Sequence, residues 1–317
     1  MTTTKRETRR SSAWPTLVRE EWEPTLATLH LWMQMVGKTR LELAPMQNHW
    51  WHTVLYVTSR GLGTSPIPYD DRMFEVDFDF FDHQLTVRTS DGETQSLALV
   101  AQPVAEFYRN YLELLRSLGL DVRINPIPSE IANPIPFPQD NTHGSYDAGA
   151  AERCWRTLVS VDRVLKEFRG GFIGKCSPVH FWWGGFDLAC TRFSGRRAPP
   201  HPGVPNIPDY VTTEAYSHEC ISAGWWPGVA DGPVTEAVFY AYAYPEPPGC
   251  PEATIKPAEA YYHPVMREWI LPYDAVSRSP VPEKLLGEFL QSTYETAADL
   301  GGWDRAALER EPVTTGT

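Results

Sequence analysis

Apolar side chains recur at helical spacing in four stretches of the chain, and this pattern predicts four helices. The first begins near Trp22 and is expected to end at Gly37, because glycine commonly follows the last turn of a helix. The other three are expected over residues 103–118, 148–168 and 283–300. The helices therefore fall into an early pair and a late pair.

Between the helices, apolar and polar residues alternate, as they do in strands with one buried face. The alternation is sharpest over residues 74–80, where Glu75, Asp77 and Asp79 share one face and apolar residues share the other. We expect this acidic face to be solvated. The predicted strands are residues 40–43, 50–58, 74–80, 84–89, 94–99, 179–183, 186–193, 216–223 and 238–244.

The order of helix, strands and helix occurs twice. Val36-Gly37-Lys38 and Ile173-Gly174-Lys175 stand at matching helix-to-strand junctions, and Leu118-Gly119 and Leu300-Gly301 close the second helix of each pair. The predicted fold class is α+β, with two tandem helix–antiparallel sheet–helix repeats related by pseudo-symmetry.

These elements suggest a division of the chain. We expect a first α+β repeat over residues 14–124, a Pro-rich connection over 125–146 and a second repeat with inserted loops over 147–309. Residues 1–13 and 310–317 are polar and are expected to be disordered tails.

Composition narrows the class of protein. The net charge of −12 repels phosphate backbones, which argues against nucleic acid as a partner. A membrane span needs about 18 or more consecutive apolar residues, and the sequence has no such run. The five cysteines form no CxxC pair, as expected of a cytoplasmic protein in a reducing compartment. None of these features indicates an oligomeric state.

Two glycine motifs fail as nucleotide sites. A phosphate-binding P-loop needs a glycine five residues before its Gly-Lys, but Trp32 and Arg169 occupy those positions. Gly61-Leu62-Gly63 lacks the third glycine of a dinucleotide fingerprint because Pro66 stands there. We therefore expect no nucleotide cofactor, and the sequence indicates no other cofactor.

Candidate chemistry gathers on the strands of the second repeat. Twelve tryptophans in the chain favour thick cores or an aromatic cavity, and a histidine with a carboxylate moves protons near neutral pH. The leading hypothesis is a pocket that binds or transforms a small organic molecule, anionic in one version of the hypothesis. Its catalytic candidates are His180, His218, Glu219 and Asp187. Its ligand-binding candidates are Lys175, Trp182, Arg196, Tyr240 and Tyr242.

Other interpretations stay open. The same residues also suit a solvated sheet face with structural ion pairs, and the protein is then a non-catalytic binding or scaffolding protein. A further alternative is a metal-dependent enzyme that uses His180, His218 and Cys220. His49 and His52 point to opposite faces of the predicted strand and cannot share a metal ion there. Whether the protein is an enzyme is undecided by these patterns.

Four sequence motifs resemble a bacterial family, the domain-of-unknown-function family numbered 5996. They are Asn48-His49-Trp50-Trp51, the stretch from Gly174-Lys175 to Asp187, Phe193-Ser194-Gly195-Arg196 and Ala215-Tyr216-Ser217-His218-Glu219. The resemblance covers about residues 14–309. It implies a soluble bacterial protein and supplies no catalytic residues.

Overall fold

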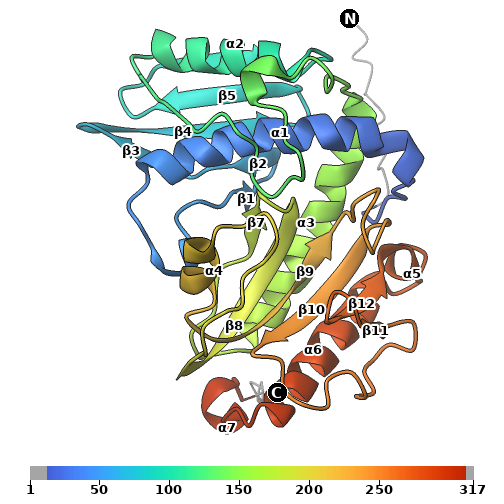
Figure 1. The fold of residues 1–317 in the computed structure, drawn as a ribbon. Helices are drawn as coiled ribbons and strands as arrows, with labels where there is room; N and C mark the ends of the chain where they lie inside the picture. The colour runs from blue at the N-terminus through green and yellow to red at the C-terminus, as the bar shows by residue number, and fades with distance from the viewer. Residues whose placement is uncertain (1–12, 312–317) are drawn as a thin grey trace, which may run out of the picture.

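A computed structural model describes residues 13–311 and has an α+β architecture built on two antiparallel sheets (Figure 1). The predicted disordered tails lie almost entirely outside the described residues. Helices and the two sheets share one continuous apolar core, in which first-half side chains such as Phe107 join second-half side chains such as Trp225. The predicted fold class is therefore confirmed, while the pseudo-symmetry within it is not.

The first sheet is built from the early strands. Its order is β1-β2-β4-β5-β6, and β3 pairs with β4 beyond the end of β2. The strands are β1 (Tyr56–Val57), β2 (Gly61–Gly63), β3 (Ile67–Tyr69), β4 (Arg72–Asp79), β5 (Gln84–Thr89) and β6 (Thr94–Ala98).

One face of the first sheet packs on helices α1 (Arg19–Leu43) and α2 (Val104–Ser117). Trp32 of α1 stacks on Phe107 of α2 with 4.3 Å between ring centroids. The opposite face carries the acidic residues of β4. Arg88 donates to Asp77 at 2.5 Å, and Arg60 pairs with Asp79. The predicted alternation in β4 is confirmed, with the acidic side chains partly exposed and bound to arginine.

The second sheet has the order β11-β12-β10-β9-β8-β7. Helices α3 (Ala148–Gly170) and α6 (Pro282–Leu300) cover one of its faces, while the other face is turned toward the viewer in Figure 1. The strands are β7 (His180–Trp182), β8 (Asp187–Arg197), β9 (His218–Trp226), β10 (Val238–Tyr244), β11 (Tyr261–His263) and β12 (Glu268–Pro272). The shorter helices are η1 (Asn48–Trp50), η2 (Phe137–Gln139), α4 (Asp209–Ala215), α5 (Tyr273–Ser277) and α7 (Arg305–Leu308).

An antiparallel bridge joins the two sheets. Leu55, just before β1, and Phe181 of β7 exchange two backbone hydrogen bonds of 2.9 Å each. Both side chains are fully buried. The bridge fixes the edge of the first sheet against the edge of the second.

The prediction that α1 ends at Gly37 is wrong. The helix continues to Leu43, so the strand predicted at residues 40–43 does not exist. Gly37 is buried in mid-helix, where a Cβ atom would lie 2.2 Å from Cδ1 of Trp183. Gly37 therefore allows Trp183 to pack closely against α1. Val36-Gly37-Lys38 is not a helix-to-strand junction, so it no longer supports an internal duplication.

The strand predicted at residues 50–58 is also largely wrong. The segment forms η1 and a turn, and only Tyr56–Val57 is strand. His49 and Trp50 both have left-handed backbone conformations, with φ of 57° and 63°. This conformation is strained for residues other than glycine, and such strain concentrates at functional sites.

Candidate functional site

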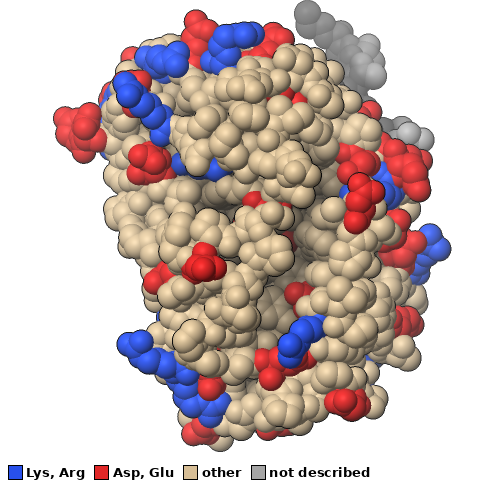
Figure 2. Space-filling view, viewed as in Figure 1, with Lys and Arg blue, Asp and Glu red and all other residues tan. Residues whose placement is uncertain are grey.

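The open face of the second sheet forms a cleft with a floor of small side chains and aromatic walls. The floor residues are Ala189, Thr191, Ser222 and Gly224, which are neighbours in the strand register. The aromatic residues on the same face are Trp182, Trp226, Tyr240 and Tyr242. Figure 2 shows the molecule hollowed over this sheet, with acidic atoms in its depth. A concave site with an aromatic lining and a few polar groups is the usual form of a small-molecule site.

Gly224 on β9 leaves space on the floor of the cleft because it has no side chain. A Cβ atom there would lie 2.4 Å from the Leu188 carbonyl oxygen and 2.9 Å from the Tyr240 hydroxyl. No other residue type fits without moving Tyr240. The glycine therefore lets the Tyr240 side chain of β10 pass over β9 and reach β8.

Asp187, at the start of β8, receives that hydroxyl. Tyr240 donates to Oδ2 of Asp187 at 2.5 Å. Burial, with a smaller contribution from the nearby Glu130 carboxylate, raises the pKa of Asp187 to about 7, against the opposing effect of the Tyr240 hydrogen bond. The Asp187 side chain still has partial access to solvent. It is therefore a carboxyl group that gains and loses its proton near neutral pH.

Two further carboxyl groups approach this position. Burial and the neighbouring Asp187 raise the pKa of Glu268 on β12 to about 8. Burial also raises the pKa of Glu130, which lies in the connection between the halves. The Glu130 carboxylate occupies the space beside Gly184 where a Cβ atom would otherwise stand. Three carboxyl groups from distant segments thus influence one another at this cleft.

Lys38 of α1 is a cation that interacts electrostatically with Glu130. Its Nζ donates to the Ser129 hydroxyl at 2.8 Å and lies 5.7 Å from the centre of the Trp183 ring. Burial lowers the pKa of Lys38 to about 8, while Glu130 opposes this effect. The sequence prediction did not include Lys38, which was assigned to a helix-to-strand junction.

The raised pKa values of Asp187 and Glu268 predict a pH-dependent stability. Both carboxyl groups bind protons more tightly in the folded state, so they destabilise the fold as pH rises from about 4 to about 8. The lowered pKa of His180 has the opposite effect and stabilises the fold as pH rises toward 6.5. The lowered pKa of Lys38 likewise stabilises the fold as pH rises, but only above about pH 8. We therefore expect the free energy of unfolding to fall between pH 6.5 and 8. Urea titrations should show a flatter profile for Glu268→Gln than for the parent protein, and parallel profiles would contradict this assignment.

A chain of tyrosines extends the cleft toward α4. The hydroxyls of Tyr216 and Tyr242 lie 3.0 Å apart, and His201 stacks on Tyr216 with 4.4 Å between ring centroids. Burial raises the pKa of both tyrosines, so their hydroxyls remain protonated. They offer neutral hydrogen-bond donors and acceptors along the wall.

His180 lies on the cleft face but beneath other side chains. It is 0% exposed, and its ring contacts those of Trp51, Tyr56 and Trp182. Neither ring nitrogen has a hydrogen-bond partner among the described residues, and burial lowers the pKa of His180 to about 3. His180 is therefore a neutral, enclosed residue, and this geometry does not suit a base that meets a ligand from solvent.

His218 is separated from His180. The His218 ring contacts that of His49 at 5.9 Å, and Trp51 lies between His49 and His180, within 5.4 Å and 5.8 Å of them. The structure thus brings His49 to His218, a pairing absent from the sequence prediction because residues 50–58 were assigned to a strand. His180 and His218 share a face but do not act on one another directly.

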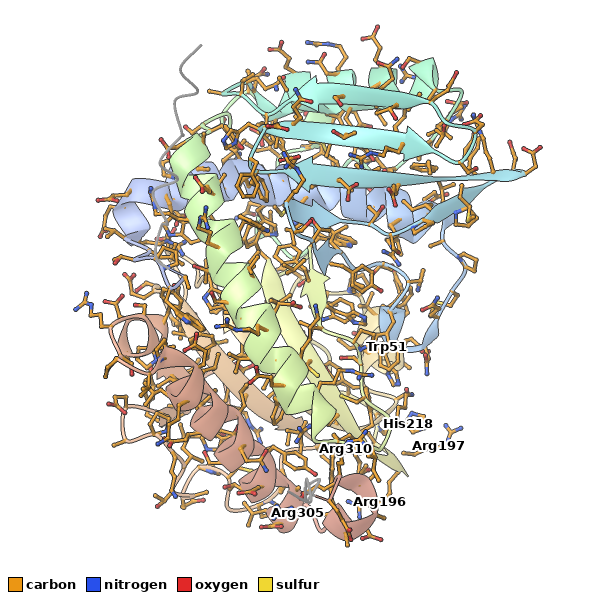
Figure 3. The ribbon with its side chains drawn as sticks, turned by 180° about the vertical axis from the view of Figure 1, so that it is seen from behind. Trp51, Arg196, Arg197, His218, Arg305 and Arg310 are labelled. Atoms are coloured by element: carbon orange, nitrogen blue, oxygen red, sulfur yellow. The ribbon has the colours of Figure 1, made fainter. Side chains whose placement is uncertain are left out.

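Glu219 and Arg196 interact with each other at the far end of β8 and β9. Arg196 donates to Glu219 at 2.8 Å and also binds the Gly301 and Gly302 carbonyls. Figure 3 places Arg196 near Arg305, well away from Trp51. The catalytic candidate Glu219 and the ligand-binding candidate Arg196 therefore form a surface ion pair distant from Asp187.

The three side chains considered as metal ligands, His180, His218 and Cys220, do not come together in the described part of the chain. Among residues 13–311, no three His, Cys, Asp or Glu side chains gather closely enough to hold a metal ion. His180, His218 and Cys220 fail because Trp51 and His49 separate the two histidines. Cys220 is also buried, which raises the pKa of its thiol to about 12.

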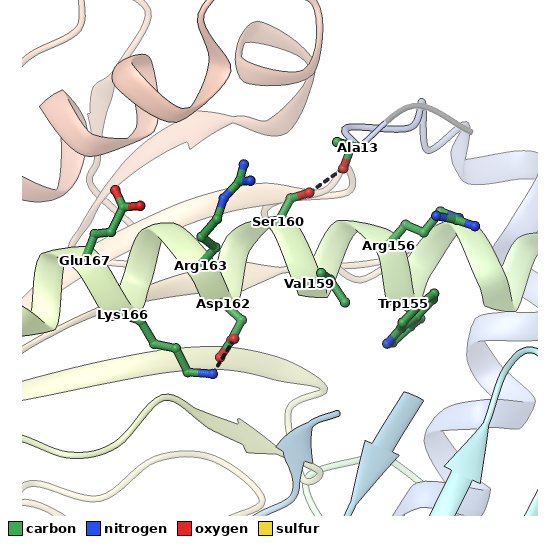
Figure 4. A pocket seen from close by; sticks show the side chains of 9 residues that line it. All are labelled: Ala13, Trp155, Arg156, Val159, Ser160, Asp162, Arg163, Lys166 and Glu167. Carbon is green, nitrogen blue, oxygen red and sulfur yellow. Dashed lines mark hydrogen bonds and ion pairs between the residues drawn. The ribbon is translucent and has the colours of Figure 1, made fainter. Parts of the chain in front are cut away.

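A second concavity runs along the outer side of α3 (Figure 4). The Ser160 hydroxyl donates to the Ala13 carbonyl oxygen there, Lys166 pairs with Asp162 at 2.6 Å, and Arg163 pairs with Glu283. Its polar groups already satisfy one another within the chain. We therefore place the candidate site in the cleft of the second sheet.

The fold and this cleft define an α+β protein with an aromatic site that carries carboxyl groups on the open face of an antiparallel sheet. The chain belongs to the Family of unknown function (DUF5996), whose model matches residues 14–310 and confirms the resemblance seen in the motifs. No curated protein and no solved structure matches the chain. Within the described residues, no helix has the length and apolar character needed to cross a membrane.

Proposed function

We propose that the protein binds a small organic molecule carrying a protonated nitrogen beside a flat apolar group, and that Asp187 exchanges a proton with it. The observation that carries the proposal is the Asp187–Tyr240 hydrogen bond of 2.5 Å on the open, aromatic face of the second sheet. Glu268, on the neighbouring β12, completes the acidic set.

The charge of the cleft favours a cationic ligand over the anionic ligand considered from the sequence. Asp187, Glu268 and Glu130 are acidic, while Lys38 is bound to Ser129 and electrostatically offset by Glu130. A buried carboxyl group resists ionisation because its charge is poorly solvated. A protonated amine beside it supplies the missing counter-charge and makes ionisation favourable.

The aromatic walls support the same class of ligand. Trp182, Trp226 and Tyr242 line the cleft with flat surfaces of negative potential. Such faces attract a cation by about 0.5–2 kcal/mol and also pack against planar apolar groups. The ring of Tyr240 stacks on that of Tyr242, with 6.1 Å between centroids, so this wall is ordered before a ligand arrives.

Acid–base chemistry is available at the same position. A group with a pKa near the working pH is the most effective proton donor and acceptor, and that of Asp187 is raised to about 7. Tyr240 holds the carboxyl group in place by a hydrogen bond to its Oδ2 atom. Asp187 thus replaces the histidines as the principal acid–base residue of the proposal.

The test compares ligands matched in shape and different in charge. Isothermal calorimetry at pH 7 would measure benzylamine, benzyl alcohol and benzoate with the parent protein, Asp187→Asn and a control, Glu75→Gln, on the outer face of the first sheet. We expect benzylamine to bind best. Asp187→Asn should weaken that binding by at least about tenfold, or about 1.4 kcal/mol, and Glu75→Gln should leave it unchanged.

Two outcomes would overturn the proposal. One is that benzoate or benzyl alcohol binds as tightly as benzylamine. The other is that Asp187→Asn retains full affinity for the amine. The asparagine keeps the size and the acceptor oxygen for Tyr240, so a loss of folding is not expected to obscure the result.

A further inference from the structure

A second group of reactive side chains lies outside the acidic cleft, where η1 and α4 meet the strand β8. The Nζ atom of Lys175 is 2.6 Å from Nε2 of His49. It lies 4.9 Å from the centre of the Phe193 ring and 5.5 Å from that of Trp51. The lysine remains exposed to solvent while His49 beneath it is buried.

The hydrogen bonds of His49 fix which of its nitrogens carries the proton. Nδ1 lies 3.0 Å from the Ala215 carbonyl oxygen, which only accepts, so Nδ1 is the protonated nitrogen. Nε2 of the neutral ring is then an acceptor directed at Lys175. Burial and the positive charge of Lys175 both lower the pKa of His49, which keeps the ring neutral.

Lys175 lacks the usual partner of a lysine. Among residues 13–311, no carboxylate lies within ion-pair distance of its Nζ atom. The carboxylate of Glu214 instead accepts the backbone N–H of His49 at 2.8 Å. Burial lowers the pKa of Lys175, and the more distant charge of Glu214 only partly offsets this.

The backbone under this group is held in a strained form. His49 and Trp50 are consecutive residues with positive φ, and the contacts of α4 maintain them there: Ala215 and Glu214 bind His49, and the Val211 carbonyl accepts Nε1–H of Trp50. Left-handed conformations of non-glycine residues cost about 1–3 kcal/mol each. The strain directs the His49 ring at Lys175.

Two basic side chains adjoin the group. His218 and Arg197 are directly paired across β9 and β8, so their side chains project from the same face. The His218 ring contacts that of His49, and Figure 3 shows Arg197 beside His218. No ion pair of Arg197 is present among residues 13–311, so its charge is available to an anion.

We propose that Lys175 is a nucleophilic amine that forms an imine with a small aldehyde or ketone carrying an anionic group. His49 accepts a proton from the Lys175 ammonium, and the neutral Nζ attacks the carbonyl carbon to give a carbinolamine. His49 returns that proton to the hydroxyl of the carbinolamine, which leaves as one water molecule. The protonated C=N bond remains, His49 is neutral again, and no oxidant or reductant takes part. Arg197 and His218 bind the anionic group of the carbonyl compound.

The experiment traps the imine on the full chain. The protein is incubated at pH 7 with glyoxylate and sodium cyanoborohydride, digested, and mapped by mass spectrometry. Lys166, Lys256 and Lys284 serve as exposed internal controls. We expect Lys175 to be labelled faster than each control lysine, because its lowered pKa leaves more of its amine neutral at pH 7 and Nε2 of His49 is placed to accept its proton.

Variants separate the roles of the neighbours. His49→Asn tolerates the left-handed backbone and removes the acceptor at Nε2, so labelling of Lys175 should fall to the rate of the control lysines. Arg197→Gln should slow labelling by glyoxylate and leave labelling by the uncharged propionaldehyde unchanged. Circular dichroism verifies that each variant is folded.

The results decide the proposal in either direction. Labelling of Lys175 at the rate of Lys166 and Lys284 would overturn it, as would full reactivity in a folded His49→Asn variant. Equal rates with glyoxylate in the parent and in Arg197→Gln would refute the anionic part alone. These measurements do not involve Asp187, so their outcome is independent of whether amines bind in the cleft.

Discussion

Replacing Arg192 with alanine is expected to destabilise the protein by about 3–5 kcal/mol, the cost of removing a large core side chain. Arg192 of β8 faces the helices and is only 2% exposed. Its guanidinium carbon lies 3.5 Å from the centre of the Phe168 ring and 4.2 Å from that of Tyr294. The alanine variant leaves a cavity between β8, α3 and α6.

Arg192→Met is the matched control for the role of charge. No carboxylate forms an ion pair with Arg192 in the described part of the chain, and its guanidinium donates only to the Phe168 carbonyl, which also accepts the Gly171 N–H. Methionine fills most of the space and needs no hydrogen bonds, so it should cost less than about 1.5 kcal/mol. Urea unfolding measures both variants. Equal losses for Ala and Met would mean that the charge, and not the packing, stabilises this site.

Gly37→Ala is expected to destabilise the fold by about 1–3 kcal/mol, the usual cost of overpacking a core. An added methyl group would lie 2.2 Å from Trp183, which cannot move aside because its Nε1–H is bound to the Thr53 carbonyl at 2.8 Å. In an unobstructed helix the same change stabilises by up to about 1 kcal/mol.

Gly287→Ala in α6 tests that reasoning, because an added Cβ atom there meets nothing within 4 Å. Thermal unfolding should show a lower midpoint for Gly37→Ala and an equal or higher midpoint for Gly287→Ala. If both substitutions raise the midpoint, the close approach of Trp183 to α1 is not required by the fold.

The local periodicity of apolar residues was sufficient to predict many of the helices and strands. The expected strands at residues 84–89 and 238–244 are β5 and β10, with identical bounds. The helices α2, α3 and α6 end within two residues of the positions expected for them. Here the apolar stripe and the flanking turns agree with the tertiary packing. Gly37 failed as a helix end because its role depends on Trp183, which is distant in sequence.

The candidate site was less accessible to sequence reasoning. Asp187, Trp182, Tyr240 and Tyr242 were selected because chemistry-bearing residues alternate on strands, and they do share one face. Glu268 was missed because β11 and β12 are short and lie between residues 244 and 283, where no helix or strand was predicted. Glu130 was missed because a Pro-rich connection has no periodicity from which its position follows.

His49 shows a different limit. Its neighbours Trp50, Trp51 and Thr53 favour a strand by residue type, yet hydrogen bonds from α4 hold the segment in a turn. A left-handed histidine has no signature in a single sequence. Only the tertiary contacts reveal that it lies between Lys175 and His218.

The bridge between Leu55 and Phe181 makes the exchange of two backbone amide hydrogens a direct measure of coupling between the sheets. Each of these amides donates across the bridge, so neither can exchange with solvent unless the edges of both sheets part. Phe181 is flanked by His180 and Trp182, whose side chains lie on the cleft face. A ligand that packs against Trp182 therefore slows deuterium uptake at Leu55, a residue of the other half of the chain.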